Sequence, residues 1–171
     1  MIPAGRYELH PLTSAAAALL LDDREAAGRL LAAHVPDSWP QPDLVRVLPR
    51  FAAQPDSVPH FGAYAVIDPC TRAVAGDIGF HGPPDDHSGE VEIGYAIVPE
   101  RRREGIASTV ARALSDWALA RDDVRAIVAG CDPSNVGSIA TLKLAGFVRN
   151  GEHQDLASLF TTPNGKNPYT R

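Results

Sequence analysis

A short basic turn in the middle of the chain carries the residue types best suited to binding a phosphate group. Residues 102–107 read Arg-Arg-Glu-Gly-Ile-Ala and fit the pattern R-x-x-G-x-A, directly before a helical pattern. Small residues allow main-chain N–H groups to approach a ligand at the positive end of a helix dipole. Arginine side chains add charge-assisted hydrogen bonds to the same group. The pattern therefore predicts a pyrophosphate site on residues 92–120, which comprise a strand, the turn and a helix.

The common nucleotide-binding motifs do not account for this turn. Gly105 stands alone, so the spacing matches neither the dinucleotide motif G-x-G-x-x-G nor the P-loop G-x-x-x-x-G-K-[ST]. The strand before the turn also follows a series of predicted antiparallel strands, whereas a dinucleotide-binding domain opens with a β-α-β unit. Both nucleotide-binding folds are therefore disfavoured.

Candidate acid and base groups lie on the strand before this turn and on a later helix. Glu90 and Glu92 are two residues apart on one predicted strand, so their side chains point to the same face. Tyr95 points to the opposite face, where packing in the core is its expected role. Asn135 begins a predicted helix and fits its N-cap, with Ser138 in the first turn. The hydroxyl groups of Tyr95 and Ser138 are the candidate proton donors to a leaving group.

Three histidines and two aromatic residues are weaker candidates. His60, His81 and His87 stand in or beside predicted loops, where a histidine is usually solvated, although each could act as a base. Trp39, in a proline-rich segment, and Phe51 could line an acceptor pocket. The favoured role of both is to attach the N-terminal helices to the sheet.

These groups require a sheet with helices on both faces to position them. A period of two residues predicts strands and an apolar repeat of about 3.6 residues predicts helices. Thr13 is a suitable N-cap for the first helix, and Gly146 is typical of the end of the last. The expected helices are residues 14–21, 24–33, 42–51, from 105 onward, and 135–145; the expected strands are 7–9, 61–67, 73–80, 89–98, 125–130, from 147 onward, and 156–160. The predicted fold class is α/β, with a mixed, mostly antiparallel central sheet.

The length of the chain predicts a single domain. Its 171 residues can bury a core without disulfides or metals. We expect acceptor-side helices and loops over residues 1–58, the sheet and cofactor-binding core over 59–160, and a loose tail over 161–171.

Composition excludes several classes of function. The net charge of −5 argues against general binding to nucleic acid, which depends on neutralising phosphates with Lys and Arg. No apolar run reaches the roughly 18 residues that a membrane span needs. The N-terminus lacks a secretory pattern, so a cytoplasmic location is expected. Cys70 and Cys131 have no CxxC spacing, and no metal site is predicted.

Four motifs in the second half of the chain occur together in one known family. They are Glu92-Ile93-Gly94-Tyr95, then Pro99-Glu100 with Arg102-x-x-Gly105-x-Ala107, then Asn135-x-x-Ser138, and Leu144-Ala145-Gly146-Phe147. In order and spacing, across roughly residues 63–160, the chain resembles the GNAT acetyltransferases, in particular the branch that includes the ribosomal-protein alanine acetyltransferases. Two departures concern Ala107, where the family often has glycine, and Lys143-Leu144-Ala145, where a charged residue more often precedes Gly-Phe.

The resemblance implies a GNAT fold and acetyl-CoA as the co-substrate. In this family the turn binds the CoA pyrophosphate through backbone amides, and the preceding strand splays from its neighbour so that pantetheine pairs with it. The implied cofactor contacts are Ile97, Val98, Arg102, Arg103, Gly105, Ile106, Ala107, Ser108 and Asn135. The resemblance also makes Glu92 the general base, acting through water, and places Ser138 near the sulfur. The alternatives are a solvent-facing carboxylate for Glu92 and a purely capping role for Asn135.

The expected reaction is transfer of the acetyl group to a primary amine by direct attack in a ternary complex. A backbone N–H near Ile97 is expected to bind the developing oxyanion. The acceptor is a protein or peptide N-terminus or a small amine, and the sequence does not choose between them. The alternative function is a non-catalytic CoA-binding sensory or interaction module, against which Glu92 and Ser138 argue. Use of another acyl-CoA, and a monomeric or homodimeric state, both stay open.

Overall fold

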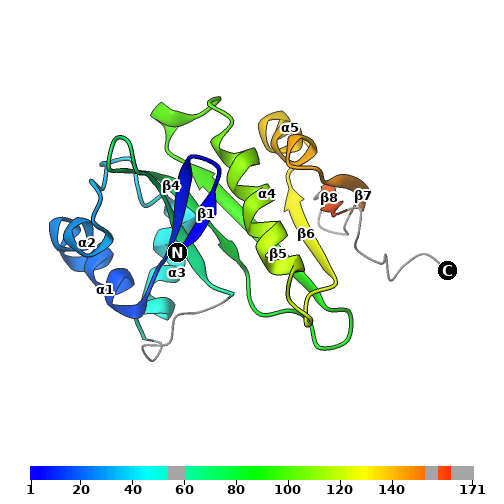
Figure 1. Ribbon diagram of the computed structural model, residues 1–171, viewed down its shortest axis with the longest axis horizontal. Helices are drawn as coiled ribbons and strands as arrows, with labels where there is room; N and C mark the ends of the chain where they lie inside the picture. Colours follow the sequence, from blue (N-terminus) through cyan, green and yellow to red (C-terminus); the bar gives the residue numbers. More distant parts are fainter. Residues whose placement is uncertain (54–60, 153–157, 163–171) are drawn as a thin grey trace.

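One mixed sheet runs through the computed structural model, which describes residues 1–53, 61–152 and 158–162 (Figure 1). The strand order is β1-β2-β3-β4-β5-β6-β8-β7, and every neighbouring pair is antiparallel except β5 and β6. The predicted mixed, mostly antiparallel sheet is confirmed. The strands are β1 (Ile2–Ala4), β2 (Tyr7–Pro11), β3 (Ala63–Asp68), β4 (Ala73–Phe80), β5 (Glu90–Ile97), β6 (Ala126–Cys131), β7 (Val148–Glu152) and β8 (Ser158–Thr161).

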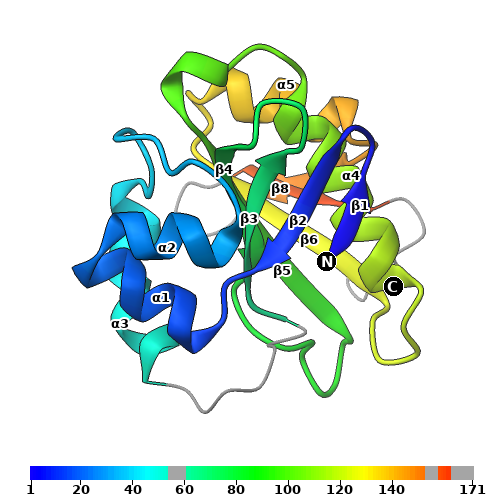
Figure 2. The ribbon, with the colours of Figure 1, turned by 60° about the vertical axis from the view of Figure 1, so that its left-hand side comes forward.

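Helices cover both faces of this sheet, as predicted. The helices are α1 (Ser14–Asp22), α2 (Arg24–Leu31), α3 (Pro42–Ala52), the short 3-10 helix η1 (Pro99–Arg101), α4 (Ile106–Leu119) and α5 (Val136–Leu144). Figure 2 shows α1, α2 and α3 together on one side of the sheet, with α4 on the other. The helical layer formed by α1–α3 therefore faces the part of the sheet that contains β3 and β4.

Local sequence explains where these helices begin. The Thr13 hydroxyl oxygen accepts a hydrogen bond from the Ala16 amide at 3.2 Å, which confirms the predicted N-cap of α1. Asp23 caps α2 in the same way through the Ala26 amide. Pro42 occupies the first turn of α3, where its missing N–H leaves no bond unmade.

Two apolar clusters hold the layers together. The larger lies between the sheet and α4, whose residues Ile106, Val110 and Leu114 are buried against it. The smaller joins α1–α3 to β3 and β4 and includes Leu48 and the fully buried Trp39. The predicted attachment of Trp39 to the sheet is thus confirmed.

The sheet opens between its two parallel strands. β5 pairs with β4 along Ile93–Ile97 but with β6 only at the three positions from Glu90 to Glu92. Beyond Glu92 the ladder between the two parallel strands ends, so main-chain groups on that edge of β5 have no partner strand. This is the splay that the resemblance implied.

Two differences from the sequence analysis concern the ends of the chain. β1 was not predicted; it pairs with β2 and adds an edge strand. The tail was expected from Thr161, but Thr161 ends β8 and Thr162 is buried. The reason is a pair of bonds to β6: the Thr162 amide donates to the Ile127 carbonyl and the Thr162 hydroxyl oxygen accepts from the Ile127 amide. The remainder of the expected tail, residues 163–171, lies outside the described residues, as does His60.

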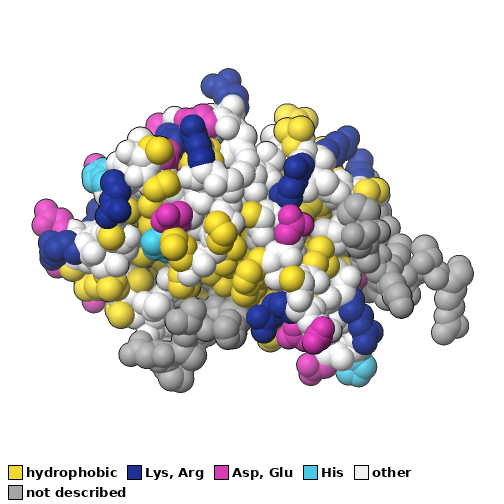
Figure 3. Space-filling model, in the orientation of Figure 1, with side chains coloured by type: hydrophobic (Ala, Val, Ile, Leu, Met, Phe, Trp, Pro, Cys, Tyr) yellow, Lys and Arg dark blue, Asp and Glu magenta, His cyan; other side chains and the backbone are white. Residues whose placement is uncertain are grey.

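The surface is mixed in character. Figure 3 shows basic and acidic side chains interspersed around the rim of one face, with hydrophobic side chains gathered near its middle. Within the described residues, no helix has the length and apolar character that crossing a bilayer requires.

Candidate active site

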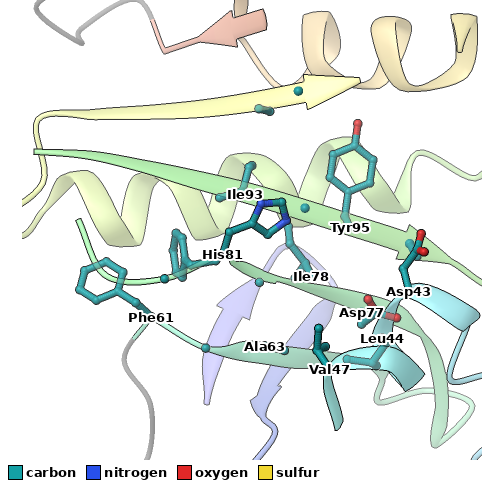
Figure 4. A pocket seen from close by; sticks show the side chains of 18 of the residues that line it. Asp43, Leu44, Val47, Phe61, Ala63, Asp77, Ile78, His81, Ile93 and Tyr95 are labelled. Carbon is teal, nitrogen blue, oxygen red and sulfur yellow. The ribbon is translucent and has the colours of Figure 1, made fainter. Parts of the chain in front are cut away.

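A large cavity lies between α3 and the open part of the sheet (Figure 4). Its volume is about 940 Å³, and its wall is formed by α3, β3, β4, β5, the end of β6 and the start of α5. The wall is mainly apolar, with a few polar groups among the aromatic and aliphatic side chains. This composition is typical of a small-molecule site.

The edge of β5 offers main-chain groups to this region. The Val98 amide donates to the Ala75 carbonyl at 3.0 Å, so Val98 is turned toward β4. Because main-chain groups alternate along a strand, Ile97 and Tyr95 present theirs on the opposite side, where β6 has separated. The predicted cofactor residue Val98 therefore contributes a buried side chain rather than a free amide, whereas the Ile97 amide lies on the edge of β5 that no longer pairs with β6.

The predicted phosphate-binding turn leads directly into α4. Gly105 has a φ of +75° and precedes the helix as its N-cap, in a conformation that favours glycine. The first amide bonded within the helix is that of Thr109, which donates to the Gly105 carbonyl. No side chain of the described chain caps this end. The amides of Ile106, Ala107 and Ser108 are thus left without intrahelical partners, as an anion site requires.

The arginines of the turn have three different roles. Arg101, whose side chain is only 20% exposed, bonds Asp68 at 2.9 Å and Glu104 at 2.9 Å and so fixes the turn. Arg102 turns back on the protein: its Nε donates to the Ile97 carbonyl at 3.0 Å. Arg103 is exposed, with a φ of +66°. Arg103 is therefore the arginine freest to meet a phosphate, and Arg102 needs to release its present bond to do so.

Gln41 connects the helical layer to the same turn. Its Nε2 donates to the Ile97 carbonyl at 2.8 Å, and its Oε1 accepts from Arg102 Nη2 at 3.3 Å. Nearby, the Ser38 hydroxyl donates to Glu100 at 2.6 Å. The segment before α3 is thus bonded both to the end of β5 and to the turn that precedes α4.

Two hydroxyl groups meet on the wall of the cavity. The Tyr95 hydroxyl lies 2.8 Å from Ser138 Oγ, and both residues line the cavity. The Tyr95 ring packs against the larger core, which was its favoured role, and its hydroxyl, one of the two candidate proton donors, lies at the cavity. Burial raises the pKa of Tyr95, so the phenol stays protonated. Asn135 accepts from the Ser138 amide at 3.0 Å and caps α5, so its predicted capping role is confirmed.

A histidine and a carboxylate form a second pair across the cavity from α5. His81 Nδ1 lies 3.2 Å from Glu92 Oε2, and this contact raises the pKa of His81. His81 lines the cavity, whereas Glu92, 46% exposed, stands behind it. The ring lies over Gly94, where a Cβ would be 2.7 Å from its Nε2. His81 is exposed, as expected of a loop histidine, but it is not isolated, because it pairs with Glu92.

The remaining predicted candidates lie outside this pairing. Glu90 is partly buried next to Asp85, and burial raises its pKa. His87 is exposed in the loop before β5. Phe51 packs against the smaller apolar cluster, which was its favoured role, and it also lines the cavity.

A carboxyl group on β4 was missed by the sequence analysis. Asp77 lines the cavity, and its Oδ2 accepts a hydrogen bond from Trp39 Nε1 at 2.7 Å. Burial, opposed by that bond and reinforced by the charge of Asp43, raises the pKa of Asp77 to about 6. The available signal was a single charge within the otherwise apolar pattern of β4.

The predicted site residues fall into distinct environments. The buried ones are Ile97, Val98 and Ile106, the half-buried ones Ala107, Ser108 and Ser138, and the exposed ones Glu92, Arg102, Arg103, Gly105 and Asn135. Within residues 1–53, 61–152 and 158–162, no three His, Cys, Asp or Glu side chains converge as metal ligands.

Comparisons with known proteins agree with this geometry. A family model described as "Acetyltransferase (GNAT) domain" matches residues 6–148. The chain is 33% identical over 115 residues to the uncharacterized N-acetyltransferase YjdG of Bacillus subtilis (strain 168), covering 66% of this chain and 68% of that protein.

Solved structures share the fold. The ribosomal-protein-S5-alanine acetyltransferase from Vibrio fischeri superposes with a TM-score of 0.62 at 17% identity, covering 97% of this chain and 96% of that one. The structure of AAC(6')-Ib in complex with paromomycin and acetyl-CoA gives a TM-score of 0.60 at 19% identity, covering 91% and 92% of the two chains.

Proposed function

The chain belongs to the GNAT family of acetyl-CoA-dependent N-acetyltransferases, and from this premise we propose that it acetylates a primary amine held in the cavity beside β5. The observation that carries the proposal is the placement of two functional pairs on one cavity. His81 with Glu92 can accept a proton, and Tyr95 with Ser138 can donate one. Both pairs lie near the point where β5 parts from β6.

The chain presents suitable groups for acetyl-CoA. The free amides at the start of α4 and the exposed Arg103 suit a pyrophosphate. The edge of β5 that has left β6 suits the amide groups of a pantetheine arm; at Ile97 the carbonyl is bonded to Gln41 and Arg102, so its amide is the group available there. We propose these residues, with Asn135, as the cofactor contacts. Bound there, acetyl-CoA supplies the acetyl group as an activated thioester.

The amine must lose a proton to attack, and we propose that the His81–Glu92 pair receives it. Glu92 was the base predicted from the sequence, but His81 stands between its carboxylate and the cavity. The carboxylate raises the pKa of His81 above its ordinary value of 6.5, which suits a base working near neutral pH. Glu92 then orients the ring and stabilises the imidazolium that forms.

The departing sulfur needs a proton and the carbonyl oxygen needs a donor. We propose that the proton comes from the Tyr95–Ser138 hydroxyl pair, within which either oxygen can be the donor. The Ile97 amide, on the open edge of β5, is the proposed donor to the carbonyl oxygen. In balance, a C–N bond replaces the C–S bond, the amine proton goes to His81 and the sulfur receives the hydroxyl proton.

The acceptor is proposed at the level of a primary amine on a small molecule or at a peptide N-terminus. Among proteins of this fold, one is named for the alanine of a ribosomal protein and another is bound to paromomycin. The cavity of about 940 Å³ can hold a small amine or the end of a peptide.

The test is release of the free CoA thiol from acetyl-CoA by the purified protein, with panels of peptides and small amines. We expect Glu92→Gln and His81→Asn each to lower turnover by roughly 10²- to 10⁴-fold, the usual contribution of a general base. Glu90→Gln is the matched control, since this carboxylate lies two residues earlier on β5 and does not line the cavity. Binding of CoA without release of thiol with any amine would instead favour a sensory module.

A further inference from the structure

The Asp77 carboxylate has a feature that the proposed reaction does not use. One oxygen is held by the fully buried Trp39. The other, Oδ1, has no hydrogen-bond partner among the described residues, and Asp77 lines the cavity. An enclosed carboxylate without a cation loses free energy relative to one in water. The position therefore suits a ligand that brings a positive charge.

A second carboxylate stands beside it. Asp43, in the first turn of α3, lines the same cavity, and its charge contributes to the raised pKa of Asp77. Figure 4 shows Asp43 and Asp77 on one side of the cavity, with His81 nearer its middle. Asp43 also pairs with Arg46, at 3.4 Å on the exposed side of the helix.

The cavity also contains a basic end. Arg50 lines it from α3, seven residues after Asp43, which is about 10 Å along a helix. Phe51 and Phe61 line the same region. The wall is thus negatively charged around Asp77, whereas toward Phe51 it is apolar and carries the positive charge of Arg50. A cation is therefore attracted to the end of the cavity near Asp77.

The group bound by Asp77 differs from the amine that reacts. Two carboxylates stabilise the charged form of an amine, whereas attack on the thioester needs the neutral form. The proton-accepting His81 lies four residues after Asp77 in the chain, which is about 13 Å along an extended strand. The reacting amine and the bound cation are therefore separate groups of one acceptor.

We propose that Asp77, oriented by Trp39 and assisted by Asp43, binds a second, positively charged group of the acceptor, so that the preferred acceptors are diamines or polyamines. This inference rests on the proposed acetylation of an amine in the same cavity. Asp77 is then a specificity-determining residue, and Trp39 is its positioning residue.

The first test measures turnover. Alkyl diamines from ethylenediamine to hexamethylenediamine are compared, each with the monoamine of equal length. We expect at least one diamine to be preferred over its monoamine through a lower KM, and we expect Asp77→Asn to reduce that ratio of kcat/KM by roughly ten- to a hundredfold. Asp122→Asn, which removes an exposed charge from the connection between α4 and β6, is expected to keep the ratio.

The second test does not need turnover. Binding of the best diamine to the protein–CoA complex is measured by calorimetry, with a weakening of about tenfold or more expected in Asp77→Asn. An equal affinity in both proteins, or an equal fall of kcat for monoamines and diamines in the variant, overturns the inference. Loss of acetylation with diamine binding retained and dependent on Asp77 would contradict the proposed function instead and leave this binding site established.

Discussion

Replacing Asp77 with asparagine is expected to stabilise the protein at neutral pH. Burial raises the pKa of Asp77 from 3.8 to about 6. A group whose pKa is raised by folding favours the folded state in its protonated form, below the unfolded pKa, and this contribution is lost as the pH rises through about 6. The asparagine side chain keeps an oxygen that can accept the hydrogen bond from Trp39, but it does not ionise. The Asp77→Asn variant therefore does not lose this part of its unfolding free energy as the pH rises.

The magnitude follows from the size of the shift. A shift from 3.8 to about 6 corresponds to about 3 kcal/mol, at about 1.36 kcal/mol for each pKa unit. The linkage relation gives the asparagine variant an advantage of about 1.5 kcal/mol at pH 5 and about 3 kcal/mol at pH 7.5. For a chain of 171 residues, the latter is a rise in Tm of about 6–12 °C.

The assay is urea denaturation at pH 5, 6 and 7.5, followed by circular dichroism. Asp43, Arg50, His81 and Tyr95 line the same cavity and are present in both proteins, so their contributions largely cancel in the difference. Asp122→Asn is the control and is expected to follow the wild-type pH profile. A difference between Asp77→Asn and wild type that is absent, or that does not grow between pH 5 and 7.5, would refute the reasoning about a buried carboxylate.

Two further substitutions test the geometry of the site. Gly94→Ala puts a Cβ 2.7 Å from His81 Nε2 and is expected to turn the exposed ring away from Glu92. We expect kcat/KM to fall about tenfold or more while Tm changes little. Unchanged turnover would show that His81 does not act from this position. Gly105→Ala meets open space but forces alanine to a φ of +75°, so a loss of about 1–2 kcal/mol in unfolding free energy is expected, and equal denaturation midpoints would contradict the left-handed conformation.

The start of α4, where we propose that the pyrophosphate binds, could be predicted because the information that places it is local. One glycine between a basic turn and an apolar helical repeat is sufficient to place the N-terminus of α4, and the helix begins at Ile106 as expected. Asn135 and Thr13 could be assigned as caps for the same reason, since a cap bonds to an amide three residues away.

The contact between His81 and Glu92, the proposed proton acceptor, could not be predicted because it depends on the register between two strands. Gly79 lies opposite Gly94, and the loop after β4 brings His81 back over that glycine to reach Glu92. Strand alternation alone places Glu92 on a face and gives no information about which side chain covers it. The pairing was therefore visible only in three dimensions.

The part of the cavity around Asp77, where we propose that the acceptor's cationic group binds, was missed for a different reason. The Asp77 carboxylate is oriented by a hydrogen bond from Trp39, which is 38 residues earlier in the chain. Its pKa is raised by burial and by the charge of Asp43 in the first turn of α3. A lone aspartate in an apolar strand marks a special position, but its partner is a property of the packed helical layer. Similarly, β1 was missed because three residues carry too little pattern.

The bonds of Gln41 imply that the two substrates cannot be treated as independent ligands. Gln41 and Arg102 share the Ile97 carbonyl, so a phosphate that draws Arg102 away also changes what holds the segment leading into α3. That helix carries Asp43, Leu44 and Val47 on the wall of the cavity proposed to hold the acceptor. Occupation of one site is therefore expected to alter the affinity of the other, and thermodynamic reciprocity requires the two effects to be equal. A bound amine would then change the Kd of CoA by the same factor as bound CoA changes the Kd of the amine.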